Sequence, residues 1–176
     1  MQRFTVSTHV YLPREPVFDF LVDLSHYAGY SEYLTDVTRE GDGGPGTRYR
    51  LSFAWWRLAY TAHSEVTAID RPERIDWRLV RHLDAEGCWR VERVDDVPAD
   101  APADAEAVSR VVFDVRYDPG SVTGEAIDLP RFVPLDRVLD RVRPLVVEEG
   151  ERIVERVVAD LEIRRREVEL TVNDRS

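Results

Sequence analysis

The sequence lacks lysine, contains a single cysteine and has no apolar run long enough to cross a membrane. With Cys88 alone, no intramolecular disulfide can form. A membrane-spanning helix needs about 20 apolar residues in succession, and no stretch approaches that length. The first residues also lack the apolar stretch followed by small residues that is typical of a signal peptide. We therefore expect a soluble, cytoplasmic protein whose 176 residues fit one domain.

The charge is strongly acidic, because 34 Asp and Glu residues oppose 24 basic residues, all of them Arg, for a net charge of -10. Clustered cationic side chains drive phosphate binding, so this balance argues against nucleic acid as a partner. A lysine-free acidic composition resembles proteins from salt-loving archaea, where salt screens dense surface carboxylates. GC-rich coding that favours Arg over Lys is the alternative, although it leaves the acidity unexplained.

Residue clusters that hold metals or phosphates are also missing. No spacing of His, Asp and Glu resembles a metal site, and a single cysteine excludes thiolate clusters. The glycine-rich segment 41–46 lies between two predicted strands, whereas a phosphate-binding loop precedes a helix. We therefore expect neither a metal nor a cofactor.

Hydrophobic periodicity predicts a strand and two short helical segments at the start of the chain. Residues 4–12 alternate between apolar and polar side chains, which is typical of a half-buried strand, and Pro13 ends it. Residues 14–24 place apolar side chains at spacings of three and four, which predicts a short amphipathic helix. The tyrosine-rich segment 25–33 is expected to form a helical turn or two, with Ser25 as its candidate cap.

Several strands follow without helical periodicity between them, which is typical of an antiparallel meander. The acidic segment 95–107, rich in Ala and Pro, has no apolar period and is expected to be a mobile surface loop before the last strand. The predicted strands lie at residues 34–40, 47–54, 58–68, 75–79, 89–92 and 111–117, and a turn is expected at Glu86-Gly87.

A long apolar stripe over residues 135–161 predicts a C-terminal helix of about seven turns. Pro144 lies inside it, and because proline costs about 3 kcal/mol in a helix interior, a kink or break is expected there. Residues 1–166 are expected to form a single domain and residues 167–176 a tail, although alternation at residues 168–172 also allows a short edge strand.

The order strand, two short helices, antiparallel strands and long C-terminal helix is that of the helix-grip topology. The segment 6–27, VSTHVYLPREPVFDFLVDLSHY, resembles the opening of the START-like (SRPBCC) superfamily, in which a strand ends in a small-Pro-x-x-x-Val-Phe pattern and the helix carries an Asp near its end. The most similar branch contains polyketide cyclase-like and coenzyme Q-binding START-like proteins. The resemblance covers nearly the whole chain. It implies an α+β fold, with a curved antiparallel sheet of six to seven strands wrapped around the C-terminal helix.

The resemblance also implies a cavity between the concave sheet and this helix, which holds a hydrophobic small molecule such as a lipid, an isoprenoid quinone or a polyketide. Periodicity directs the apolar faces of the sheet and the helix toward one another, and the hydroxyls of Tyr49 and Tyr60 are candidates for orienting a ligand. A closed core filled by the same aromatic side chains is the alternative. The candidate ligand-binding residues are Tyr33, Tyr49, Phe53, Tyr60, Trp77, Trp89, Phe113, Val138, Leu139 and Val142.

The sequence contains no evident catalytic constellation, so a non-enzymatic binding or carrier protein is the leading hypothesis. In the alternative of a cyclase or dehydratase, Tyr49, Tyr60 or His26 acts as acid or base. In a third alternative, a protein-interaction module, a partner contacts the loop 95–107.

Arginines on the predicted strands alternate with acidic neighbours and are expected to form cross-strand pairs on the outer face of the sheet. A register shifted by one residue would instead bring Arg50 or Arg90 into the cavity, where either would bind a carboxylate or an enolate.

Overall fold

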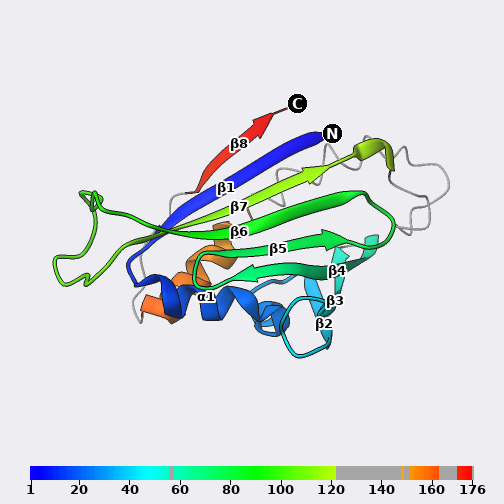
Figure 1. Cartoon of the computed structure of the whole chain (residues 1–176), viewed down its shortest axis with the longest axis horizontal. Coiled ribbons are helices and arrows are strands. Elements are labelled where there is room, and N and C mark those ends of the chain that lie inside the picture. Colours follow the sequence, from blue (N-terminus) through cyan, green and yellow to red (C-terminus); the bar gives the residue numbers. More distant parts are fainter. Residues whose placement is uncertain (56–57, 122–147, 149–150, 163–169, 176) are drawn as a thin grey trace.

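The computed structural model describes residues 1–55, 58–121, 148, 151–162 and 170–175. In these residues, eight strands form one antiparallel sheet in the order β2-β3-β4-β5-β6-β7-β1-β8 (Figure 1). Helices follow the first strand and precede the last, which confirms the α+β helix-grip architecture. The elements are β1 (Gln2–Val10), α1 (Arg14–Val22), the 3-10 helix η1 (Leu24–Gly29), β2 (Leu34–Glu40), β3 (Arg48–Trp55), β4 (Leu58–Asp70), β5 (Arg74–Leu79), β6 (Ala85–Arg93), β7 (Ser109–Tyr117), the 3-10 helix η2 (Pro119–Ser121), a C-terminal helix over residues 151–162, and β8 (Thr171–Arg175).

The strand count differs from the expected six to seven because β8 adds to the outer edge of β1, with Val172 opposite Val6. The alternation at residues 168–172 therefore marks an edge strand, although it begins later than the pattern indicates. Figure 1 shows β8 beside β1, with both chain ends at the same side of the sheet.

Two strands depart from the predicted pattern. The register shifts between Val66 and Ala68 on β4, so that Ile69, opposite Ile75, returns to the inner face in place of Ala68. The predicted turn at Glu86-Gly87 is wrong, because β6 begins at Ala85 and contains both residues.

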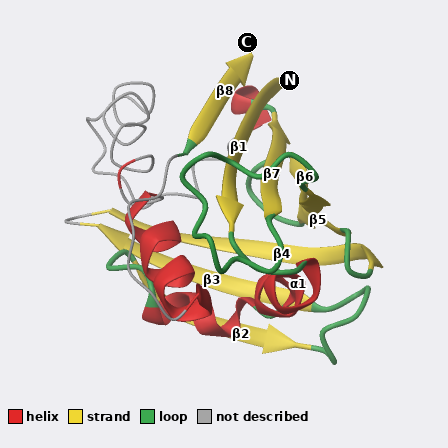
Figure 2. Cartoon of the chain, turned by 90° about the vertical axis from the view of Figure 1, so that its left-hand side faces the viewer, coloured by secondary structure: helices red, strands yellow, loops and turns green. Residues whose placement is uncertain are grey.

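The helices cover one end of the inner face of the sheet. The buried core joins Phe18 and Leu21 of α1, Val158 of the C-terminal helix, and Tyr49 and Val91 of the sheet. Figure 2 shows α1 and the C-terminal helix on the same side of the sheet. Because each fully buried large apolar side chain contributes about 1.5–3 kcal/mol, this contact fixes both helices against the sheet.

The 3-10 helix η1 is capped by Asp23 and not by Ser25, so the predicted cap is wrong. The Asp23 carboxylate accepts a hydrogen bond from the Ser25 backbone N at 3.0 Å, because a carboxylate at this position satisfies a free N–H of the first turn. Burial opposes ionisation, but hydrogen bonds from Ser25 and the charges of Arg39 and His26 leave the pKa of Asp23 lowered.

Polar contacts tie the C-terminal helix to the start of the chain. The Tyr11 backbone N donates to Glu162 Oε1 at 2.7 Å. The Tyr30 hydroxyl donates to Asp160 Oδ2 at 2.8 Å, and Arg156 Nη1 donates to the Tyr30 carbonyl at 2.6 Å. The tyrosine-rich segment therefore contacts this helix through Tyr30, the residue directly after η1.

The acidic segment 95–107 connects β6 and β7 and contains neither helix nor strand. It projects beyond the end of the sheet in Figure 1. Tyr11 donates its hydroxyl hydrogen to Asp100 Oδ2 at 2.9 Å, while Val97 is 63% exposed. The segment thus leaves the body of the sheet but is tied to it through Tyr11.

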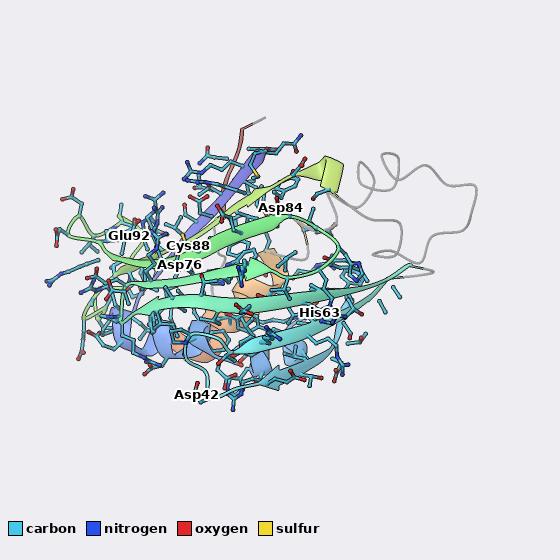
Figure 3. All side chains as sticks on the ribbon, turned by 45° about the vertical axis from the view of Figure 1, so that its right-hand side comes forward. Asp42, His63, Asp76, Asp84, Cys88 and Glu92 are labelled. Carbon is cyan, nitrogen blue, oxygen red and sulfur yellow. The ribbon has the colours of Figure 1, made fainter. Side chains whose placement is uncertain are left out.

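Arg48, Arg50, Arg78 and Arg90 lie on the outer face, as the alternation predicts. Arg48 and Arg78 both pair with Glu65, at 3.0 and 2.9 Å. Arg50 lies opposite His63 and Arg90 opposite Arg74, in the register that places the aromatic residues of these strands on the inner face. The shifted register that would bring Arg50 or Arg90 into the interior is therefore wrong. Figure 3 shows the same outer side, with Asp76, Cys88 and Glu92 on neighbouring strands.

Asp114 is the buried carboxylate of this outer face, at 6% exposure. Arg3 Nε donates to Asp114 Oδ1 at 2.9 Å and a second Arg3 nitrogen contacts Oδ2. These hydrogen bonds lower the pKa of Asp114. Because the pKa of Asp114 is lower in the folded than in the unfolded chain, its ionised carboxylate stabilises the fold above about pH 4. This stabilisation is lost as the pH falls through the folded-state pKa.

An Asp114→Asn variant is therefore expected to be less stable than the parent at neutral pH, with a difference that shrinks as the pH falls below about 4. Urea unfolding at a series of pH values measures this difference. Glu106→Gln, at an exposed position, serves as the control. A difference in unfolding free energy that stays constant across the series would show that the charge of Asp114 does not stabilise the fold.

Candidate functional site

Five of the predicted ligand-binding residues share the inner face of the sheet and are half-buried: Phe53, Tyr60, Trp77, Trp89 and Phe113. We call this set the aromatic face. Phe53 stacks on Tyr60 with ring centroids 6.2 Å apart. The Phe113 ring lies 5.7 Å from that of Trp77 and 4.3 Å from that of Trp89. The aromatic face therefore consists of a pair on β3 and β4 and a cluster on β5, β6 and β7.

Gly87 explains how Trp77 reaches Phe113. These two residues lie on strands that are two apart, about 10 Å in the direction of the strand hydrogen bonds, so the indole must lean across β6. Gly87 lies opposite Trp77 on β6, and a Cβ there would meet Trp77 Cζ2 at 2.6 Å and the Asp114 carbonyl oxygen at 2.4 Å. The missing side chain leaves the space that the indole occupies.

The indole nitrogen of Trp77 is buried and has no hydrogen-bond partner among the residues that the structure describes. Buried tryptophan N–H groups usually find an acceptor. An unpaired buried donor costs about 1–3 kcal/mol, so this nitrogen is an unsatisfied polar atom within an otherwise apolar cluster of rings.

The remaining predicted residues do not join the aromatic face in the described part of the chain. Tyr49 is 2% exposed and belongs to the core, where its hydroxyl donates to the Val22 carbonyl at 3.3 Å. Tyr33 follows η1 and is half-buried, and its backbone N donates to Ser31 Oγ at 3.1 Å. Val138, Leu139 and Val142, together with Pro144, lie outside the described residues.

The three candidate acid/base groups do not converge on one point. The His26 side chain is 63% exposed, with Nε2 at 3.7 Å from Asp23 Oδ2. Tyr60 lies opposite Phe53, and Phe53 is four residues along β3 from Tyr49. Tyr49 and Tyr60 are therefore separated by about 13 Å along the strand direction. Burial raises the pKa of Tyr49 and of Tyr60, so both hydroxyls stay protonated near neutrality.

Comparison with known proteins decides the family. A family model described as polyketide cyclase / dehydrase and lipid transport matches residues 1–162. The chain belongs to this family. Its members therefore include both proteins that act on polyketides and proteins that transport lipids, and the chain lies in the START-like SRPBCC superfamily. No curated protein matches the chain in sequence.

Solved structures show the same fold at low sequence identity. The aromatase/cyclase Zhui of a Streptomyces species aligns with a TM-score of 0.61 at 15% identity, over 92% of this chain and 94% of its own. Ara h 8.0201 aligns with a TM-score of 0.59 at 17% identity, over 92% and 98% of the two chains. The protein TTHA0849 of Thermus thermophilus aligns equally well, with a TM-score of 0.59 at 17% identity over 92% and 97%.

For this member of the polyketide cyclase / dehydrase and lipid transport family, three hollows on the described surface lie away from the aromatic face. One of about 430 Å³ separates the start of α1 from the loop after β6, and one of about 550 Å³ lies near His9 and Arg110. The third, about 720 Å³, lies between α1 and the β2–β3 turn, beside Asp23 and Arg39. Their linings mix charged and apolar residues, so none offers the continuous apolar surface of the aromatic face.

Metal and membrane functions gain no support from the described residues. Within them, no group of three or more His, Cys, Asp and Glu side chains is arranged to hold a metal ion. No helix among them is long and apolar enough to span a membrane.

Two features of the site were not predicted from sequence. Gly87 was assigned to a turn, whereas its place within β6 opposite Trp77 shapes the aromatic face. The unpaired indole nitrogen of Trp77 also depends on how the rings pack. The sequence did contain one indication of the role of Gly87, which is a single glycine within a run of strand residues. Such a glycine often marks a place where another group closely approaches the strand backbone.

Proposed function

We propose that this protein binds a hydrophobic small molecule on the aromatic face, between the inner face of the sheet and the C-terminal segment, and serves as a carrier for it. The observation that supports this most is the half-buried set of stacked rings on the inner face. The apolar residues Val138, Leu139 and Val142 are proposed to cover the ligand from the opposite side.

The location of the core favours a ligand over a closed interior. The fully buried core lies beneath α1 and Val158, and of the aromatic face only Trp89 packs against it. The rings of Phe53, Tyr60, Trp77 and Phe113 therefore retain accessible apolar surface within the described structure. Covering such surface is favourable by about 25 cal/mol per Å², which provides the driving force for a hydrophobic ligand.

The proposed ligand classes are isoprenoid lipids or quinones and polyketide-like molecules. Native mass spectrometry of the protein purified from its own cells tests this directly. A bound mass of a few hundred daltons in addition to the 20.3 kDa chain is expected. A bare chain that also takes up no added hydrophobic compound would contradict carriage, and a bare chain that converts an added polyketide would favour a cyclase.

A Phe113→Ser variant is expected to bind the hydrocarbon fluorene at least about tenfold more weakly than the parent, because Phe113 contacts both Trp77 and Trp89. Quenching of tryptophan fluorescence measures the affinity. Arg116→Ala is the matched control, since Arg116 lies on the same strand, is exposed and points to the outer face. Equal affinity in the parent and Phe113→Ser would place the ligand elsewhere.

A further inference from the structure

The unpaired indole nitrogen of Trp77 indicates which polar group a ligand on the aromatic face would carry. Its indole nitrogen is buried without a hydrogen-bond partner in the described part of the chain. The ring contacts Phe113 on one side and crosses Gly87 on β6. The indole is therefore confined by its neighbours, and turning it toward another acceptor would disrupt the stacking with Phe113.

The described residues that surround Trp77 on the inner face are apolar and uncharged. In the sheet register, Val66 and Gly87 flank Trp77, and Trp89 and Phe113 lie in the adjacent row. Arg74 and Arg78 of β5 and Arg90 of β6 occupy the outer face. Arg93, at the far end of β6, is six residues from Gly87, is exposed and pairs with Asp95. Because no described residue places a cation beside it, the indole N–H favours a neutral oxygen acceptor over a carboxylate, whose burial without a counter-charge is costly.

We propose that the indole N–H of Trp77 is the polar anchor of the binding site and selects ligands that carry a neutral carbonyl oxygen on a flat apolar body over pure hydrocarbons of the same shape. This inference rests on the proposed function, since it concerns the same aromatic face. The carbonyl oxygen accepts the hydrogen bond that Trp77 lacks, while the apolar body stacks on Phe113 and Trp89.

The test compares fluorenone with fluorene, which share a flat three-ring skeleton and differ by one carbonyl oxygen. The parent protein is expected to bind fluorenone about tenfold more tightly, because pairing a buried donor is worth about that factor. In Trp77→Phe the ratio of the two affinities is expected to fall to about one. This ratio, and not the affinity for fluorene alone, reports the anchor, because Trp77 also belongs to the aromatic face. Trp89→Phe is the control, because it keeps the anchor and is expected to keep the preference.

An NMR spectrum of the parent protein with labelled tryptophan provides a second measurement that does not depend on the stability of any variant. The Trp77 indole N–H signal is expected to shift downfield with fluorenone and much less with fluorene. Equal binding of both compounds with an unmoved Trp77 signal would overturn the anchor while leaving hydrophobic binding intact. Binding of neither compound would overturn the proposed function together with the anchor.

Discussion

The Phe18→Ala variant is expected to lose about 3–5 kcal/mol of unfolding free energy, the range for removing a fully buried aromatic ring. Phe18 is 1% exposed in the core, and the Arg71 guanidinium lies 5.1 Å from its ring centroid. The ring joins α1 to the sheet, so its loss removes apolar burial and leaves a cavity in the core beneath α1. Urea unfolding followed by circular dichroism measures the change.

Val97→Ala provides the comparison for this core substitution. Val97 is 63% exposed in the loop after β6, so its truncation is expected to change stability by no more than about 0.5 kcal/mol. Similar small losses in both variants would mean that α1 does not pack on the sheet as the structure has it.

The Gly87→Ala variant is expected to lose about 1–3 kcal/mol of unfolding free energy and to bind fluorene at least about tenfold more weakly. The added Cβ would lie 2.4 Å from the Asp114 carbonyl oxygen, and a backbone atom held in the sheet cannot move aside. The same Cβ would lie 2.6 Å from Trp77 Cζ2 and push the indole off Phe113. One methyl group therefore alters both the sheet and the aromatic face.

Gly29→Ala is the matched control for this substitution. A Cβ at Gly29 meets nothing within 4 Å, so the change is expected to leave both stability and binding close to those of the parent. Chemical denaturation and fluorescence titration apply to both variants. If Gly87→Ala behaved like Gly29→Ala, Trp77 would not lie across β6.

The strands could be predicted because their side chains alternate between two different environments. On β3, Tyr49, Leu51 and Phe53 face inward while Arg48 and Arg50 face outward, and a period of two follows directly from strand geometry. The same alternation located β8, although its bounds shifted. The N-terminal motif, with Val17 and Phe18 buried at 1% exposure each, marked the helix that closes the core.

Features that depend on neighbours in space could not be predicted from local pattern. Ser25 and Asp23 are both good capping residues, and only the path of the chain decides that Asp23 accepts the hydrogen bond. Tyr49 and Tyr60 occupy equivalent alternating positions, yet α1 covers Tyr49 and not Tyr60. The sequence thus identified the inner face but could not divide it into a closed core and an aromatic face.

That division is the link between fold and function. The end of the sheet that α1 and the C-terminal helix cover provides stability, since it contains the fully buried side chains. The aromatic face provides apolar surface and contains the Trp77 indole nitrogen, a buried donor without a partner among the described residues. A family that joins polyketide chemistry with lipid transport requires both a rigid sheet and an apolar interior surface.

The most direct test of ligand binding on the aromatic face is an isotope-filtered NOE spectrum of the labelled protein with fluorenone. Cross-peaks from the ligand to ring protons of Phe113, Trp77 and Trp89 are expected. Cross-peaks confined to the surface hollows, such as to Val97 beside α1 or to Pro45 in the β2–β3 turn, would contradict binding on the aromatic face.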